Sequence, residues 1–222
     1  MVGLLSACAG NTTAVIDSLR YAVQRDSTIE KTLLNPELRY LRATIRGRTA
    51  LLVLGYVENH PQGPIQVWYS AEREVLRLQN GRLVGAVGLI VEWRNVTVSP
   101  LPAWASLAVT GQAEHLVRAR DVMPGYRYGV KDILSLKRSA PPSGSALQVL
   151  DPHSLAWFEE SMEFEPGQAA LASEIGLPTA RYAVAFGGDA EEVVYGEQCL
   201  SREFCFAWQR WPAAPLSRTE TR

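Results

Sequence analysis

Residues 4–8 carry the most specific chemical pattern in the chain, Leu-Leu-Ser-Ala-Cys. This pattern is typical of a lipobox, in which a small residue precedes a cysteine that becomes the lipidated first residue of the mature protein. Leu4 and Leu5 are apolar enough to lie in the membrane, and the small side chains that follow suit the cleaving peptidase. The Cys8 thiol would then accept the diacylglycerol. We therefore predict that lipid on Cys8 holds the chain to a membrane, outside the reducing cytoplasm.

The segment before Cys8 is short for an export signal. Seven residues precede it and none is charged, whereas a secretory signal has a positive start and an apolar stretch of about 7–15 residues. Two interpretations stay open: translation starts upstream of Met1, or the match is a chance one and Cys8 is an ordinary cysteine. The small, polar residues 9–13 resemble a tether and favour lipidation. A single acyl chain binds only reversibly, so stable anchoring needs more than one.

The other two cysteines, Cys199 and Cys205, flank a short segment between two strand-like stretches. In a hairpin they would face each other at a separation that a disulfide tolerates. We expect a disulfide if the compartment is oxidising, and closing so short a loop would stabilise the fold by roughly 2–3 kcal/mol. The alternative is a pair of buried free thiols.

Four carboxylates gather in one stretch of the chain. They are Glu159, Glu160, Glu163 and Glu165. A glycosidase uses two carboxylates, one as the acid and one as the base or nucleophile. A solvated face explains the cluster more simply, so a glycan-modifying enzyme is kept only as an alternative.

Other catalytic and metal-binding patterns are absent from the sequence. The three histidines, His60, His115 and His153, lie in different regions, and none has a partner at metal-ligand spacing. Neither the Gly-x-Ser-x-Gly elbow of serine hydrolases nor a phosphate-binding glycine loop occurs. The sequence therefore predicts no catalytic residue, no metal and no cofactor.

The tryptophans allow two interpretations. Large aromatic side chains fill the core or the concave face of a curved sheet, and they also stack on sugar rings. Core filling is the favoured interpretation for each of the six tryptophans. The alternative is glycan binding by Trp68, Trp104 and Trp157.

The composition is that of a folded domain. The 222 residues are 47% hydrophobic and 20% charged, which is ordinary for a globular protein, and no apolar stretch is long enough for a transmembrane helix. The net charge of −1 gives no attraction to nucleic acid, so no such partner is expected. Nearly all basic residues are arginines. Genome composition explains this most simply, and bidentate recognition of carboxylate or phosphate is the functional alternative.

The residues after Pro36 have the pattern of a β-protein. Residues 12–34 have helical apolar spacing, and Asn35-Pro36 would end that helix. Strand-like stretches then follow at 38–45, 49–57, 65–70, 75–79, 82–87, 90–98, 113–120, 126–137, 180–186, 192–195 and 204–208. Such spacing with short turns indicates an antiparallel meander.

Local signals refine this expectation. Asn80-Gly81 is the strongest hairpin signal, because both turn positions need a positive φ. Residues 139–145 are expected to form a loop, and residues 155–165 are ambiguous between helix and strand. We predict one β-rich domain over residues 12–212, between a signal remnant and tether (residues 1–11) and a flexible tail (residues 213–222).

Several stretches taken together carry a family resemblance. They are Leu5-Ser-Ala-Cys8, Val53-Leu-Gly-Tyr-Val-Glu58, Trp68-Tyr-Ser-Ala71, Leu78-Gln-Asn-Gly-Arg-Leu-Val84 and Val87-Gly-Leu89, with weaker agreement at 157–173 and 182–198. These stretches resemble the YjbF/GfcB family of group 4 capsule and exopolysaccharide lipoproteins. The short N-terminal signal and the Cys199/Cys205 pair depart from the family pattern.

The resemblance implies a fold and a role. The fold is a large antiparallel sheet curled into a half-barrel, with an N-terminal helix and one or two short helices packed on it. The role is a non-enzymatic, outer-membrane lipoprotein on the periplasmic face that assists capsule or exopolysaccharide assembly or export. Its partners would be the membrane, through the lipid, and a polysaccharide or other polysaccharide-export proteins.

Three possible functions have structural discriminators. A periplasmic carrier of an acyl chain or lipid-linked glycan would have an apolar concave face without converging polar groups. Glycan binding would need a groove with arginines and exposed tryptophans. An enzyme would place two carboxylates about 5–9.5 Å apart in a cleft.

Overall fold

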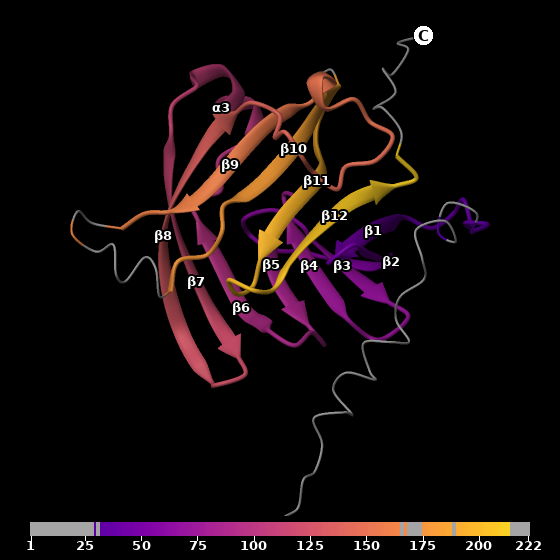
Figure 1. Ribbon diagram of the computed structural model, residues 1–222, viewed down its shortest axis with the longest axis horizontal. Coiled ribbons are helices and arrows are strands. Elements are labelled where there is room, and N and C mark those ends of the chain that lie inside the picture. The colour runs from indigo at the N-terminus through magenta and orange to yellow at the C-terminus, as the bar shows by residue number, and fades with distance from the viewer. Residues whose placement is uncertain (1–28, 30–31, 165–166, 168–174, 188–189, 214–222) are drawn as a thin grey trace, which may run out of the picture.

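Twelve antiparallel strands form the molecule (Figure 1). The computed structural model describes residues 29, 32–164, 167, 175–187 and 190–213. The strands are β1 (Tyr40–Ile45), β2 (Arg48–Glu58), β3 (Ile65–Ser70), β4 (Val75–Gln79), β5 (Arg82–Val87), β6 (Glu92–Ser99), β7 (Glu114–Met123), β8 (Arg127–Ser139), β9 (Ala156–Met162), β10 (Ala180–Gly187), β11 (Ala190–Cys199) and β12 (Cys205–Trp211).

The sheet is a meander whose two ends meet. Each strand pairs with its neighbours in sequence, and β1 pairs with both β2 and β12. The predicted antiparallel, mainly β fold is therefore confirmed. The sheet curls beyond the half-barrel that the resemblance implied, until its first and last strands pair in a closed ring. Closure leaves no unpaired outer edge on β1 or β12.

The β4–β5 turn follows from its two residues. Asn80 and Gly81 have φ angles of 46° and 74°, the positive values that a two-residue hairpin turn requires. A side chain at position 81 would also collide with Val193, since a Cβ there would lie 2.2 Å from Cγ2. The hairpin signal is confirmed, and packing adds a second reason for glycine.

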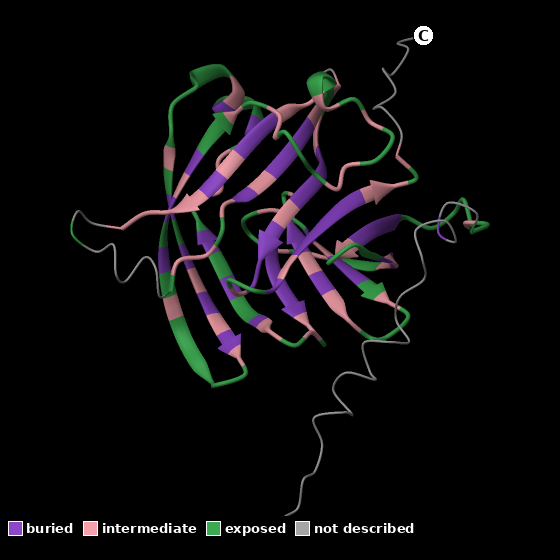
Figure 2. Cartoon of the chain, viewed as in Figure 1, coloured by how far each residue is buried: buried purple, intermediate pink, exposed green. Residues whose placement is uncertain are grey.

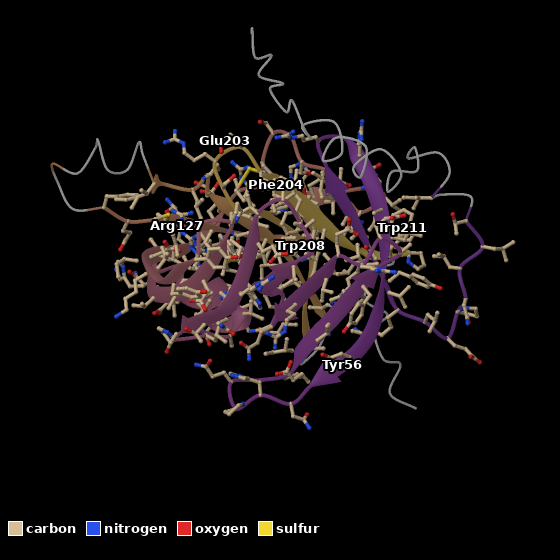
Figure 3. All side chains as sticks on the ribbon, turned by 90° about the horizontal axis from the view of Figure 1, so that it is seen from below. Tyr56, Arg127, Glu203, Phe204, Trp208 and Trp211 are labelled. Atoms are coloured by element: carbon tan, nitrogen blue, oxygen red, sulfur yellow. A yellow bond between two sulfur atoms is a disulfide. The ribbon has the colours of Figure 1, made fainter. Side chains whose placement is uncertain are left out.

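Large side chains fill the ring. Five of the six tryptophans, Trp68, Trp93, Trp104, Trp157 and Trp208, are at most 2% exposed. Trp208 lies in the middle of the molecule in Figure 3, whereas Tyr56 lies at its edge. A smaller apolar cluster around Trp157 and Tyr195 is covered by the segment 146–155. Strands β10–β12 are consequently largely buried, whereas the tip of the β7–β8 hairpin is exposed (Figure 2).

Two local predictions are now decided. The ambiguous residues 155–165 contain strand β9, which follows a short 3-10 helix, η1 (Pro152–Ser154). Short helices packed on the sheet were expected without a position in the chain. Helix α3 (Trp104–Thr110) is such a helix; it packs through Trp104 and Leu107 and ends at Gly111 in the left-handed conformation.

The N-terminal predictions lie almost entirely outside the described residues. This applies to the helix over 12–34 and to the tether over 1–11, and the division into domain, tether and tail stays a prediction. Among the described residues, no helix is both long and apolar enough to cross a membrane.

Candidate functional site

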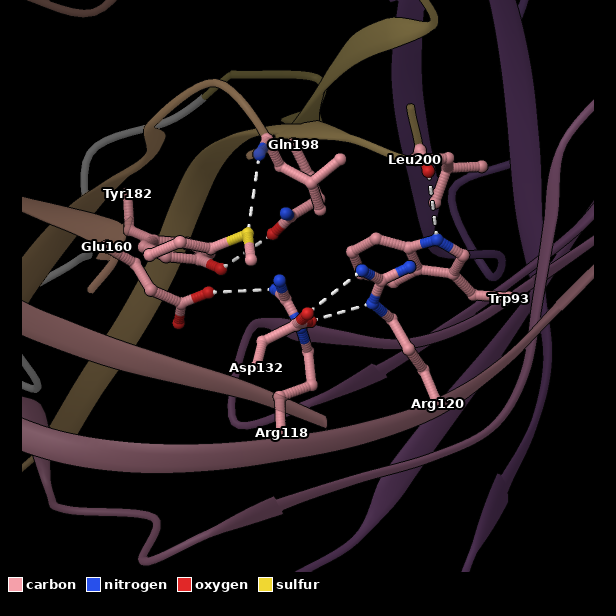
Figure 4. A network of polar contacts seen from close by, with 10 residues as sticks. Trp93, Arg118, Arg120, Asp132, Glu160, Tyr182, Gln198 and Leu200 are labelled. Atoms are coloured by element: carbon pink, nitrogen blue, oxygen red, sulfur yellow. Dashed lines mark hydrogen bonds and ion pairs between the residues drawn. The ribbon is translucent and has the colours of Figure 1, made fainter. Parts of the chain in front are cut away.

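A buried charged cluster lies inside the ring on β7, β8 and β9 (Figure 4). Arg118 and Arg120 are two residues apart, so they share the face of β7 that also carries Leu116. Asp132 is the direct cross-strand partner of Arg118 on β8, and Glu160 joins from β9. All four charged side chains belong to residues at most 5% exposed. Strand register alone therefore brings the cluster together.

Asp132 accepts hydrogen bonds from both arginines. Arg120 binds it with two N–H groups, Nε at 2.7 Å from Oδ2 and Nη2 at 3.0 Å from Oδ1. Arg118 Nε donates to the same Oδ2 at 2.8 Å, and Arg118 Nη1 lies 3.2 Å from Glu160 Oε1. The guanidinium fork favours such two-point pairing with a carboxylate. Two cations and two anions therefore balance within this cluster.

Trp93 forms an aromatic wall beside the two arginines. The guanidinium carbons of Arg118 and Arg120 lie 4.6 Å and 4.7 Å from its ring centroid, within the range of cation–π attraction. The Trp93 indole N–H donates to the Leu200 carbonyl oxygen at 3.1 Å. The wall is thus itself fixed by a hydrogen bond to the β11–β12 connection.

Electrostatics fix the charge of Asp132 at neutral pH. Burial by itself favours its neutral form, but the hydrogen bond from Arg120 and the charges of both arginines prevail and lower the pKa of Asp132. Burial raises the pKa of the nearby Tyr182, and the Glu160 charge acts in the same direction. The Tyr182 hydroxyl donates to Gln198 Oε1 at 3.1 Å. This arrangement suits holding strands in register better than exchanging protons.

Another buried arginine, Arg82 on β5, lacks a hydrogen-bond acceptor among the described residues. It is 1% exposed, and its Nε, Nη1 and Nη2 have no hydrogen-bond partner in the described structure. Its Cζ lies 3.8 Å from the Trp104 ring centroid. Burial lowers the pKa of Arg82, although Tyr182, Glu160 and Glu191 oppose that effect. Arg82 is therefore a buried cation that packs against the face of an indole ring, whereas a carboxylate would be its expected partner.

A shallow hollow of about 370 Å³ lies beside the disulfide. Its polar lining includes Arg181, Tyr195 and Glu197. Arg181 Nη1 donates to Glu197 Oε2 at 3.3 Å, and the Tyr195 hydroxyl donates to the same carboxylate. Burial, together with that hydrogen bond, raises the pKa of Tyr195. The hollow thus offers a cation, a carboxylate and a hydroxyl to hydrogen-bond a ligand.

The cysteine predictions have separate outcomes. Cys199 and Cys205 are joined in a disulfide, with their Cα atoms 3.9 Å apart and directly opposite on β11 and β12. Cys8 lies outside the described residues, so its lipidation stays a prediction.

The structure places the predicted glycan-binding tryptophans in the interior. Trp68 and Trp104 are fully buried and Trp157 is 1% exposed. The indole N–H groups of Trp104 and Trp157 donate to the carbonyl oxygens of Asn80 and Pro152. In this conformation none of the three rings offers a face to a sugar from solvent.

The candidate catalytic carboxylates lie beside arginine or histidine side chains where they are described. Glu159 lies 3.6 Å from Arg181, Glu160 binds Arg118, and Glu163 lies 2.9 Å from His115. Glu165 lies outside the described residues. His60 contacts Gln79, and the His153 backbone N–H donates to Asp151 Oδ1, which caps η1. No group of three metal-ligating side chains is positioned for a metal ion within the described ranges.

Comparison with known proteins connects this geometry to a family. Residues 21–169 match the family described as group 4 capsule polysaccharide lipoprotein gfcB, YjbF. The chain belongs to the YjbF family. The match confirms the resemblance and includes its most specific stretches, between residues 53 and 89, whereas residues 5–8 and 182–198 lie outside the matched range.

A solved structure supports the fold of this YjbF-family chain. The crystal structure of the hypothetical lipoprotein YmcC from Escherichia coli (K12) is similar, with a TM-score of 0.56 and 16% sequence identity. The similarity covers 95% of this chain and 100% of that one. No curated protein sequence matches the chain significantly.

The interior meets only some of the discriminating criteria. Converging charges on β7–β9 do not fit a carrier with a purely apolar concave face. The arginines are present, but the tryptophans beside them are buried rather than exposed. Asp132 and Glu160 are both bound to Arg118, so they do not form a free pair of carboxylates.

Sequence reasoning missed the arginines that organise the interior. Residues 113–120 were expected to alternate, but alternation does not say which face points inward. Arg118 and Arg120 point inward, while Val117, which precedes Arg118, is 44% exposed. The available signal was Leu116 on the arginine face, together with an aspartate at the matching position of the next strand.

Proposed function

We propose that this YjbF-family chain is a lipid-anchored, non-enzymatic protein on the periplasmic face of the outer membrane. In this role it assists assembly or export of a capsule or exopolysaccharide. The observation that carries the proposal is the family match over residues 21–169. The lipobox pattern at residues 4–8 supports it independently.

Three structural features support a binding and scaffolding role. The ring is closed by β1–β12 pairing and tied by a disulfide, as suits an exported protein. The carboxylates Glu159 and Glu160 pair with arginines, and Glu163 contacts His115. The hollow with Arg181 and Glu197 presents hydrogen-bonding groups of the kind that sugar hydroxyls use. A rigid body of this kind would act by binding at the membrane surface.

Metabolic labelling tests the anchor. The gene is expressed from its own locus, so that the natural translation start is kept, and cells are fed an alkynyl palmitate. We expect the wild-type chain to incorporate the label and to sediment with the outer membrane. The variant Cys8→Ser should lose the label and the sedimentation. A Cys199→Ser/Cys205→Ser variant is the matched control, because it should keep the label.

The role in polysaccharide export is tested in the same strains. Deleting the gene should lower the amount of surface polysaccharide, and Cys8→Ser should restore it less well than the wild-type gene. An unlabelled wild-type chain in the cytosol would contradict the anchor. Unchanged surface polysaccharide in the deletion strain would contradict the role.

A further inference from the structure

Arg82 lacks what the other two interior arginines have. A guanidinium carries five N–H donors and no acceptor, and buried charged groups are normally paired and hydrogen-bonded. Arg118 and Arg120 share the Asp132 carboxylate. The Nε, Nη1 and Nη2 atoms of Arg82 have no hydrogen-bond partner although the residue is 1% exposed.

The acidic groups nearest to Arg82 already have other partners. Glu160 accepts from Arg118. The two carboxylate oxygens of Glu191 accept the backbone N–H groups of Trp104 and Ala105, at 3.2 Å and 2.7 Å. The fold thus brings negative charge close to Arg82 without giving it an acceptor.

Helix α3 closes the end of the ring at which Arg82 lies. The Trp104 ring covers the guanidinium at 3.8 Å, and its indole N–H donates to the Asn80 carbonyl oxygen at 3.0 Å. On the other side, Arg138 near the end of β8 donates to the Ala108 carbonyl oxygen at 3.1 Å. Figure 1 shows α3 beside the ends of β8 and β9.

The attachment of α3 is limited. Of its seven residues only Trp104 and Leu107 are buried, and Val109 is exposed. A few hydrogen bonds and two side chains therefore hold the helix in place. An outward movement of α3 would withdraw Trp104 from Arg82 and open the guanidinium to the end of the ring.

We propose that Arg82 is the recognition group of a binding site closed by α3, and that it takes the carboxylate or phosphate group of an acidic sugar. Either group has the planar or tripod oxygens that a guanidinium fork pairs with at two points. The anionic character of the ligand follows from the unpaired donors of Arg82. Its sugar character rests on the proposed function.

Titration calorimetry on the full-length chain tests this site. The probes are sodium glucuronate and glucose 1-phosphate, at constant ionic strength. Glucose serves as the uncharged control, and acetate and inorganic phosphate serve as bare anions. The variants are Arg82→Met, Arg82→Lys and, as the matched control, Arg127→Gln at an exposed position of β8.

We expect saturable binding of at least one acidic sugar, tighter than that of the bare anion with the same group. Arg82→Met should weaken it by at least about tenfold, the loss expected for a charge-assisted hydrogen bond. Arg82→Lys keeps the charge without the fork and should weaken binding less. Arg127→Gln should leave binding unchanged.

Three results would overturn the proposal. They are no saturable binding of either acidic sugar, equal binding by the wild type and both Arg82 variants, or binding of the bare anions as tight as that of the sugars. The Arg82→Lys variant keeps the test decisive if Arg82→Met does not fold. A wild-type chain without palmitate label, or unchanged surface polysaccharide in the deletion strain, would refute the proposed function without changing this calorimetric readout, so the two failures are distinguishable.

Discussion

Buried arginines have different partners in two parts of the ring interior. On β7–β9, Arg118 and Arg120 are held by Asp132 and Glu160 beside Trp93. On β5, Arg82 has the aromatic neighbour but no carboxylate. Removing one partner of a buried pair leaves an uncompensated charge, whereas removing a charge that has no partner relieves that cost. The comparison teaches that equal burial can serve stability in one place and ligand recognition in another.

The largest effect is expected from Asp132→Asn. The substitution removes the charge that both arginines share, so the free energy of unfolding should fall by about 3–5 kcal/mol. Urea denaturation of the purified chain measures it. Asp151→Asn is the matched control, because the Asp151 side chain accepts the His153 N–H at the start of η1, and asparagine caps equally well. If Asp132→Asn lowers the free energy of unfolding no more than Asp151→Asn does, the charge pairing on β7–β9 does not stabilise the fold and the comparison fails.

The opposite sign is expected from Arg82→Met. Without ligand, replacing an unpaired buried charge by an apolar side chain of similar length should be neutral or stabilise the fold by about 1–4 kcal/mol. The same denaturation series measures it. Destabilisation comparable to that of Asp132→Asn would mean that Arg82 is already paired in solution, and the contrast between the two parts would fail.

Acid should weaken the paired part selectively. The pKa of Asp132 is lowered in the fold, so the unfolded chain binds this proton more readily. The contribution of Asp132 is therefore fully present above the unfolded pKa, about 3.9, and is lost as the pH falls through the lower, folded value. Stability measured from pH 6 to pH 2 should drop more steeply for the wild type than for Asp132→Asn. Parallel curves would show that Asp132 carries no such linkage.

The smallest effect is expected outside the interior, at Arg181→Gln. Arg181 is partly exposed and lies 3.3 Å from Glu197 and 3.6 Å from Glu159. Water screens such pairs, so the loss should be about 0.2–1 kcal/mol. A loss approaching that of Asp132→Asn would show that burial does not separate the two classes of arginine.

The sequence was sufficient for every strand except β9, and for one turn. Short-range rules apply where neighbours decide the conformation, as at Asn80-Gly81, whose positive φ angles match the expectation. The Cys199–Cys205 disulfide was also predictable, because a hairpin places the two residues opposite each other.

The interior was not predictable because long-range packing decides it. Arg82 directly follows the predicted turn, yet its burial depends on Trp104 from helix α3, whose position in the chain no local pattern indicated. The residues of β7 alternate as expected, and the face that carries the arginines is the one that points inward. Arginines on the inward face are stable only because the register of β7 and β8 places Asp132 opposite Arg118.

The central claim is that Arg82, unlike Arg118 and Arg120, is free to bind an anion. The arginine side-chain region of a ¹H–¹⁵N NMR spectrum tests this claim most directly. The Nε–H signals are assigned by their loss in single Arg-to-Met or Arg-to-Lys variants and followed as sodium glucuronate or glucose 1-phosphate is added at constant ionic strength. The account predicts that with at least one of the two, the Arg82 signal shifts to saturation while those of Arg118 and Arg120 stay in place. An Arg82 signal that does not move with either, or three signals that move together, would contradict it.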